Sequence, residues 1–202
     1  MHVVLNCAVD RHGRMAGPGG EPVRISTEGD LRRVHALRAQ SDAILVGVET
    51  VLRDDPSLRV RSAYAEGPDP VPVVLDTHLR TPATARVVRA GTRIYHHAAS
   101  TTLGDATLVR VPLAGKRLDL AAVLHDLETA GVQRLMVEGG PTVLQAFIEA
   151  GSWVTWTVFQ ADADIGDGPG LWDGLPEAQP AGVGLVSKES RDGGVLWTFS
   201  PA

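Results

Sequence analysis

Short apolar runs alternate with stretches of helical periodicity along the first three quarters of the chain. The run Val3–Leu5 predicts a first strand, because a polar turn over residues 10–13 follows it closely. A helix is predicted from about residue 28 to residue 39, where apolar side chains recur at helical spacing behind polar cap residues. Ala43–Val48 is continuously apolar and too short for a typical helix, so it predicts a strand buried on both faces.

The same alternation continues through the middle of the chain. Three further strands are predicted at Val71–Leu75, Arg93–His96 and Leu108–Val111. Asp119 caps the helix that comes next, and Gly131 stops it. Arg134–Val137 predicts another strand, followed by a helix that ends before Gly151.

The last quarter of the chain predicts strands with no helix between them. Trp153–Phe159, Val183–Ser187 and Val195–Phe199 are expected to be antiparallel, the last two forming a hairpin around residues 192–194. The whole pattern predicts an α/β fold with a mostly parallel sheet, helices on both faces and an antiparallel C-terminal edge. Because a chain of 202 residues buries enough apolar surface in one core, a single domain over residues 1–202 is expected.

Composition narrows the range of partners. With 44% hydrophobic and 21% charged residues, the chain has the make-up of an ordinary globular protein. A net charge of −5 argues against nucleic acid, which requires clustered Lys and Arg in excess of Asp and Glu. The single cysteine, Cys7, cannot form an intramolecular disulfide, and the N-terminus lacks a signal peptide, so the cytoplasm is the expected location. No membrane span is expected either, since no apolar run approaches roughly 20 residues.

The sequence Glu138-Gly-Gly-Pro-Thr142 lies between a predicted buried strand and a helix. Its glycines let the backbone approach a ligand closely, and the free N–H groups that begin a helix form a partial positive charge suited to phosphate. The diphosphate of a dinucleotide fits such a site. A tight turn selected only for packing explains the glycines equally well, so both interpretations stand.

A second polar segment, residues 47–61, follows the buried strand at 43–48, and loops in that position form ligand crevices in open α/β sheets. Its side chains suited to a hydroxyl, ribose or phosphate ligand are Thr50, Asp54, Asp55, Arg59 and Arg61. On this segment alone, a solvated turn with Asp-Pro as a helix stop is the favoured alternative. Arg38, near the end of the first helix, either reaches inward to an anion or only complements the helix dipole.

Neither metal binding nor hydrolysis finds support in the pattern. His96 and His97 are the only adjacent histidines, and neighbours on a strand point to opposite faces. No cysteine pair is present, so no metal site is expected. No serine lies in a Gly-x-Ser-x-Gly elbow.

Taken in order, four segments closely resemble the riboflavin-biosynthesis reductase family: Asp30–Gly47, Thr50–Arg61, Val74–Asp76 and Val137–Thr142. That family comprises the C-terminal reductase domain of bacterial RibD deaminase-reductases and the stand-alone archaeal reductases, with a three-layer dihydrofolate-reductase-like fold. The resemblance covers roughly residues 3–151 and is densest over 30–61. It implies NADPH-dependent reduction of the ribosyl group of a 5-amino-6-ribosylamino-pyrimidine 5′-phosphate to ribityl, with hydride delivered to the sugar C1.

The resemblance also implies roles for the residues that match the family. Those implied to face NADPH are Ala8, Thr50, Asp54, Thr77, Gly139, Gly140, Pro141, Thr142, Val143 and Leu144. Those implied to face the substrate are Arg38, Leu58, Arg61 and Glu138, with the arginines on its phosphate. Glu138 is the catalytic candidate that polarises or protonates the reacting sugar, and a purely hydrogen-bonding role is its equal alternative. The choice of NADPH over NADH comes from the resemblance alone.

The chain departs from the family pattern near both ends of the first predicted loop. Asp10 and His12 stand where Ser and Asp are expected, Pro22 replaces a small polar residue, and Arg24 stands where members often carry Trp or Lys. Two alternatives to the riboflavin reaction therefore stay open. One is a reductase of the same fold acting on another pyrimidine, pterin or secondary metabolite, and the other is a non-catalytic nucleotide-binding module.

Two further expectations concern assembly and domain content. The family is implied to form homodimers, but Asp162 and Asp164 lie where members carry an apolar strand that serves the dimer, so an altered interface is expected. The zinc signature of the cytidine-deaminase-like domain is not found in the sequence, so the chain is expected to have no deaminase domain.

Overall fold

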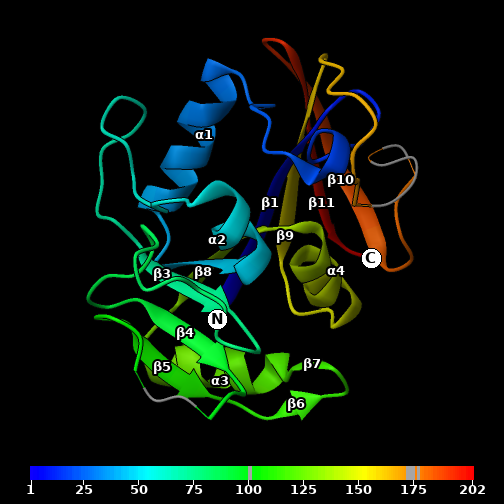
Figure 1. Cartoon of the computed structure of the whole chain (residues 1–202). Coiled ribbons are helices and arrows are strands. Elements are labelled where there is room, and N and C mark those ends of the chain that lie inside the picture. Colours follow the sequence, from blue (N-terminus) through cyan, green and yellow to red (C-terminus); the bar gives the residue numbers. More distant parts are fainter. Residues whose placement is uncertain (100–101, 172–175, 177) are drawn as a thin grey trace.

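The computed structural model describes residues 1–99, 102–171, 176 and 178–202 of the protein. The strands are β1 His2–Val9, β2 Ala43–Gly47, β3 Val71–Leu75, β4 Arg93–His96, β5 Thr107–Arg110, β6 Leu113–Ala114, β7 Arg117–Leu118, β8 Arg134–Gly139, β9 Thr155–Ala161, β10 Val183–Arg191 and β11 Gly194–Pro201. The helices are α1 Glu28–Ala39, α2 Val48–Asp54, α3 Leu120–Thr129 and α4 Pro141–Glu149, with a 3-10 turn η1 at Pro18–Gly20. Figure 1 shows their arrangement, with α1 and α2 lying close together.

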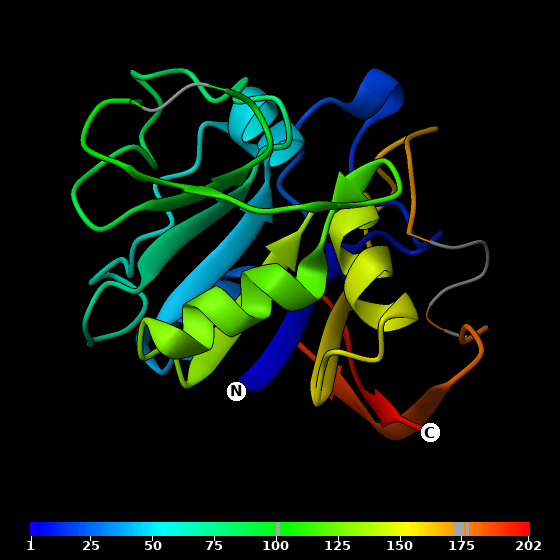
Figure 2. The same ribbon diagram turned by 90° about the horizontal axis from the view of Figure 1, so that it is seen from below.

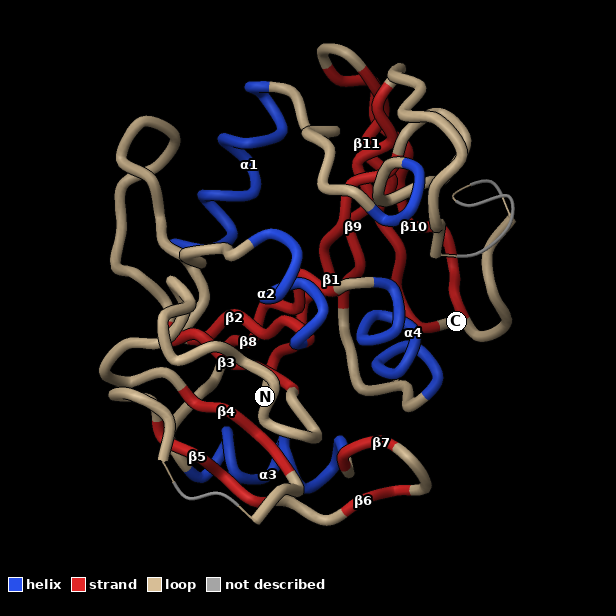
Figure 3. The backbone as a smooth tube through the Cα atoms, viewed as in Figure 1, coloured by secondary structure: helices blue, strands red, loops and turns tan. Residues whose placement is uncertain are grey.

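A single nine-stranded sheet organises the described residues, in the order β10-β11-β9-β1-β8-β2-β3-β4-β5 (Figure 3). All strands from β9 to β5 pair parallel with their neighbours, whereas β11 pairs antiparallel with both β9 and β10. The mostly parallel sheet with an antiparallel C-terminal hairpin is therefore confirmed. The chain steps outward from β2 to β5 and then returns to place β8 between β1 and β2, which makes β1 and β8 the central strands.

Helices cover both faces of the sheet, because the strands alternate between two cores. In β2, Leu45 belongs to the core that includes buried side chains of α3 and α4, whereas Ile44 and Val46 belong to the core that includes Val34 of α1 and Val51 of α2. Seen from below, α3 and α4 lie in front of the strands (Figure 2). This is the three-layer architecture that the sequence predicts.

Two predictions about secondary structure were wrong. The polar segment after β2 is not a solvated turn, since residues 48–54 form α2, which packs through Val48 and Val51 and ends at Asp55 with a left-handed φ of 38°. The strand β9 is antiparallel only to β11. It pairs parallel with β1, because α4 returns the chain across the sheet before β9 begins.

The short hairpin β6–β7 was not predicted. Across the described residues, no helix has both the length and the apolar character that a bilayer crossing requires.

Candidate active site

The candidate site lies at the carboxyl ends of the parallel strands, where the connections from β1, β2, β3 and β8 meet. The chain order reverses around β1 and β8, and open α/β sheets bind ligands outside the strand ends at such a point. The segments that reach this edge are the loop after β1, the helix α2 after β2, the turn after β3 and the glycine turn between β8 and α4.

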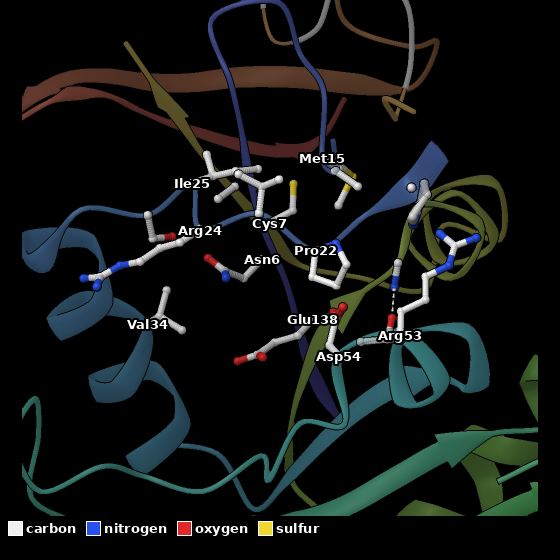
Figure 4. Close-up of a pocket in the computed structure, with 18 of the residues that line it drawn as sticks. Asn6, Cys7, Met15, Pro22, Arg24, Ile25, Val34, Arg53, Asp54 and Glu138 are labelled. Atoms are coloured by element: carbon white, nitrogen blue, oxygen red, sulfur yellow. Dashed lines mark hydrogen bonds between the residues drawn. The ribbon is translucent and has the colours of Figure 1, made fainter. Parts of the chain in front are cut away.

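Two adjoining cavities occupy this edge. The first has a volume of about 580 Å³ and includes Ala8, Arg38, Thr50, Asp54, Arg61, Glu138, Gly140 and Pro141 in its lining. The second has a volume of about 720 Å³ and includes Thr50, Thr77, Gly140, Pro141, Thr142 and Val143. Figure 4 looks into the first cavity and shows Asn6, Asp54 and Glu138 around the open space. We call the first the arginine cavity, after Arg38 and Arg61, and the second the glycine-turn cavity.

A bidentate ion pair between Arg38 and Glu138 forms one wall of the arginine cavity. The Nε and Nη2 groups of Arg38 donate to the two carboxylate oxygens of Glu138 over 2.7 and 2.6 Å, and Nη1 donates to the carbonyl of Arg59 over 3.1 Å. Both side chains are largely buried, with 16% and 13% of their surface exposed. Burial acts to lower the pKa of Arg38, but the charge and hydrogen bonds of Glu138 outweigh it and raise the pKa. The pair holds the Glu138 carboxylate in a fixed orientation at the end of β8.

Arg61 is attached to α1 through its backbone. Its N–H donates to Nδ1 of the buried His35 over 3.1 Å, and the His35 ring stacks on Tyr64 with centroids 5.1 Å apart. The hydrogen bond requires an unprotonated Nδ1. Burial lowers the pKa of His35, and the positive charges of Arg38 and Arg61 lower it further. The neutral ring therefore anchors the segment that presents Arg61 to the cavity.

This anchor predicts a pH-dependent stability. Unfolded His35 takes up a proton near the ordinary value of 6.5, whereas the folded state resists it until a lower pH. Since the unfolded state binds more protons in that window, the free energy of unfolding should fall as the pH drops below 6.5. Urea denaturation across this range measures the effect. His96 also has a pKa lowered by burial, so the comparison is with His35→Asn, whose side chain does not titrate and whose stability should change less with pH. Identical pH profiles would contradict the assignment to His35.

The glycine turn is constrained by close packing against α2 and α4. Gly139 has a φ of 94°, and a Cβ there would lie 3.1 Å from Cδ1 of Leu144, so both backbone and space favour glycine. The N–H of Gly140 donates to the Thr50 hydroxyl over 3.1 Å, the hydrogen bond drawn as a dashed line in Figure 4. A Cβ on Gly47 would lie 2.9 Å from Val143. The same turn is therefore both closely packed, at Gly139, and open to the cavities, at Gly140.

Most of the residues singled out from the sequence converge on the two cavities. Asp54 lines the arginine cavity, and partial burial raises the pKa of its carboxyl. Three of those that the resemblance implies do not line either cavity: Leu58 is 1% exposed in the core, Leu144 is buried on the core side of α4, and Gly139 is buried at the end of β8. Their implied ligand contacts stay predictions. Asp55 and Arg59, the other two candidates of residues 47–61, line neither cavity.

Residues that depart from the family pattern around the first loop interact with the loop after β9. The fully buried Asp10 accepts hydrogen bonds from the N–H groups of His12, Arg14 and Ile165 over 2.8, 2.9 and 3.2 Å. Nε2 of His12 lies 3.3 Å from Asp164. Asp10 therefore ties the loop after β1 to the loop after β9, and His12 and Asp164 form a pair in which both members are departures.

Two charged residues at the site were missed because α2 was not predicted. Glu49 and Arg53 both line the two cavities, on the same helix as Thr50 and Asp54. The signal that could have found them is the spacing of Val48 and Val51, which are three residues apart and buried. A helix with that apolar side turns Glu49, Thr50 and Arg53 toward the cleft.

The fold and the cleft define a three-layer α/β protein with a ligand site at the carboxyl ends of parallel strands. The chain belongs to the RibD C-terminal domain family, whose model matches residues 1–196. It is 36% identical over 191 residues to the 2,5-diamino-6-ribosylamino-4(3H)-pyrimidinone 5′-phosphate reductase of Archaeoglobus fulgidus, with 86% of each chain covered. It is 42% identical over 157 residues to the protein of the same name from Methanothermobacter thermautotrophicus, covering 74% of this chain and 72% of that one.

Solved structures agree on the fold. RibD of Acinetobacter baumannii superposes with a TM-score of 0.84 at 23% identity, covering all of this chain and 58% of that one, so the chain spans little more than half of that RibD. The riboflavin biosynthesis reductase Rib7 of Saccharomyces superposes with a TM-score of 0.79 at 20% identity, covering 100% of this chain and 90% of that one. The predicted family and fold class are thereby confirmed.

Proposed function

We propose that this protein is a reductase of riboflavin biosynthesis that uses NADPH to reduce the ribosyl group of a 5-amino-6-ribosylamino-pyrimidine 5′-phosphate to ribityl. The observation that carries the proposal is the convergence of Arg61 and the Arg38–Glu138 pair on one cavity that adjoins the glycine turn. Family membership and the names of the two archaeal relatives, both reductases of such a phosphate, support it.

The residues present fit a dinucleotide in both size and chemistry. Two cavities of about 580 and 720 Å³ side by side offer separate space for its two nucleosides. Gly47 and Gly139 let α4 pack closely against the strand ends, since a Cβ at either would lie within 3.1 Å of Val143 or Leu144. The residues that would hold the cofactor in the glycine-turn cavity are Gly140, Pro141, Thr142 and Val143, together with Thr77 of the same lining. Ala8 would contact it from β1.

When bound, NADPH supplies the hydride that the sugar C1 receives. The protein's own contribution is to hold the opened sugar in place and to exclude water. Glu138, oriented by two hydrogen bonds from Arg38, is placed to accept a hydrogen bond from a sugar hydroxyl or to exchange a proton with it. Arg61, which has no acidic partner within ion-pair distance among the described residues, is the cation available for the substrate phosphate.

The reaction is tested by mixing the protein with NADPH and the aminopyrimidine ribosyl phosphate and following the loss of NADPH absorbance. Mass spectrometry should show a product heavier than the substrate by H₂. Tight NADPH binding with no oxidation would favour the second candidate, a reductase of the same fold with another substrate. That candidate draws on Pro22 and Arg24, which differ from the family pattern and line the arginine cavity.

Arg61→Ala should weaken binding of the phosphorylated substrate by about 2 kcal/mol or more, the scale of one lost charge-assisted contact. The affinity for NADPH should stay nearly unchanged, since Arg61 lines neither the glycine-turn cavity nor the boundary that the two cavities share. Isothermal titration with each ligand separates the two. The matched control is Arg59→Ala, because that side chain pairs with Asp69 outside both cavities. An equal loss for both ligands would show that Arg61 is structural.

The homodimer and the cytoplasmic location belong to the same proposal. An exposed edge strand supports self-association, because β10 is the outermost strand at its end of the sheet and carries the exposed side chains Leu185 and Val186. Light scattering on the purified protein tests the dimer. Imaging of a fluorescent fusion in the source cells tests the location.

A further inference from the structure

The passage between the two cavities has a defined lining. The residues that line both are Gly20, Glu49, Thr50, Arg53, Gly140, Pro141 and Pro169. A dinucleotide consists of two nucleosides joined by a diphosphate. If the adenine nucleoside lies in the glycine-turn cavity and the nicotinamide nucleoside lies beside the substrate in the arginine cavity, the diphosphate must lie in this passage. The charges lining the passage therefore decide how tightly the diphosphate is held.

Among the described residues, Arg53 is the only cation that lines the passage. The other charged residue in the described lining is Glu49, whose carboxylate contacts the guanidinium of Arg80. The Arg53 guanidinium lies directly over Gly20, since a Cβ on that glycine would lie 2.7 Å from Nη1 of Arg53. Because glycine has no side chain, the Arg53 guanidinium can occupy the space beside Gly20.

Arg53 also differs from most cations of the site in forming no ion pair among the described residues, although its charge acts on the carboxyl of the neighbouring Asp54. Three of the five arginines that line the cavities pair with glutamates: Arg24 with Glu28, Arg38 with Glu138 and Arg117 with Glu149. Within the described part of the chain, no carboxylate lies within ion-pair distance of Arg53 or of Arg61. Arg53 and Arg61 are thus the two lining arginines outside any described ion pair, and Arg61 lies in the arginine cavity alone.

The position of Arg53 is fixed through α2. Val48 and Val51 bury one side of this helix, and Thr50 on its other side accepts the N–H of Gly140. Arg53 follows Thr50 by three residues and so projects from the same side of the helix. Figure 4 shows its side chain extending beside the hydrogen bond that joins α2 to the glycine turn. The helix therefore carries the guanidinium to the glycine turn.

We propose that Arg53 binds the diphosphate of the dinucleotide and sets the affinity for the cofactor rather than for the pyrimidine substrate. This inference rests on the proposed function, because it takes the passage as the diphosphate site. It makes Arg53 a binding residue remote from hydride transfer. Its contact would be the same in the ground state and the transition state, so it contributes to cofactor binding and not to kcat.

The test is Arg53→Gln, with NADPH binding measured by isothermal titration calorimetry and kinetics measured separately. The dissociation constant for NADPH should rise about tenfold, or ~1.4 kcal/mol, and its dependence on salt should weaken. The KM for NADPH should rise to match, while kcat and the substrate affinity stay within about twofold. Arg53→Lys should restore part of the affinity, because the charge returns without the planar fork.

Arg32→Gln is the matched control, since Arg32 is exposed on α1 and lines neither cavity. If the unaltered protein binds no dinucleotide, the proposed function fails and the inference falls with it. If the protein binds NADPH and Arg53→Gln changes the affinity by less than about twofold, the inference alone is overturned. A loss of substrate affinity in place of cofactor affinity would also overturn it, because it would place Arg53 on the pyrimidine phosphate.

Discussion

Glu138→Gln should lower kcat by at least about 100-fold while the affinity for NADPH stays within about twofold. The glutamine side chain keeps the shape of glutamate but cannot exchange a proton with the sugar. Its NH₂ group also replaces one of the two oxygens that accept hydrogen bonds from Arg38. Since both oxygens of Glu138 accept from Arg38 at 2.7 and 2.6 Å, the orientation of the side chain is also lost in part. Steady-state kinetics with the pyrimidine phosphate measures the effect.

The outcome distinguishes a catalytic role for Glu138 from a binding role. A fall confined to kcat, with the substrate dissociation constant unchanged, assigns proton exchange to this carboxylate. A rise in the substrate dissociation constant with kcat preserved would contradict that assignment and leave Glu138 as a hydrogen-bonding residue only. Glu189→Gln, the same chemical change on the exposed strand β10, is the control and should leave all constants unaltered.

The Arg38–Glu138 pair also predicts non-additive effects. Both side chains are largely buried, so removal of either leaves an uncompensated charge that the double variant does not have. Arg38→Gln combined with Glu138→Gln should therefore be more stable than the sum of the single changes predicts. The family resemblance implies that both residues face the substrate, but the sequence does not show that they bind each other. They are 100 residues apart, and the contact depends on how α1 packs beside the end of β8.

What the sequence predicted well were the elements with a strong apolar period. The strand at Ala43–Gly47 is buried at every position, and its continuous apolar run is typical of a strand with helices on both faces. The helix α2 was missed because only Val48 and Val51 face the core, while the polar residues between and after them match a turn equally well. Because α2 was not predicted, the position of Arg53, on which the cofactor inference depends, could not be predicted either.

The direction of β9 shows a different limit of sequence reasoning. A strand period is the same whichever way the strand runs, so the pattern of Trp153–Phe159 could not say whether β9 is parallel to its neighbour. Its direction follows from the connection, since α4 lies between β8 and β9 and makes the crossover that joins parallel strands. The positions of the well-predicted strands along the chain were thus correct, whereas their pairings across the sheet required the structure.

Asp10→Ala should lower the free energy of unfolding by about 3 kcal/mol, the largest stability effect expected here for a single polar side chain. The carboxylate is fully buried and accepts the N–H groups of His12, Arg14 and Ile165. Alanine leaves all three donors without their acceptor, and each unsatisfied buried donor costs on the order of 1 kcal/mol or more. Urea denaturation with an unchanged slope measures the loss.

Asp10→Asn separates hydrogen bonding from simple packing at this position. Its single amide oxygen can still accept from His12 and Arg14, but the NH₂ group then faces the N–H of Ile165, so an intermediate loss is expected. Asp164→Asn removes an exposed partner of His12 and Arg14 and should cost much less than either change at Asp10.

Because the loop that Asp10 holds continues into Asp167, Gly168 and Pro169 of the glycine-turn cavity, the Asp10→Ala variant should also bind NADPH more weakly. Undiminished stability in Asp10→Ala would show that the loops after β1 and β9 are held together by other contacts, and that the departure from the family pattern at this position has no structural cost.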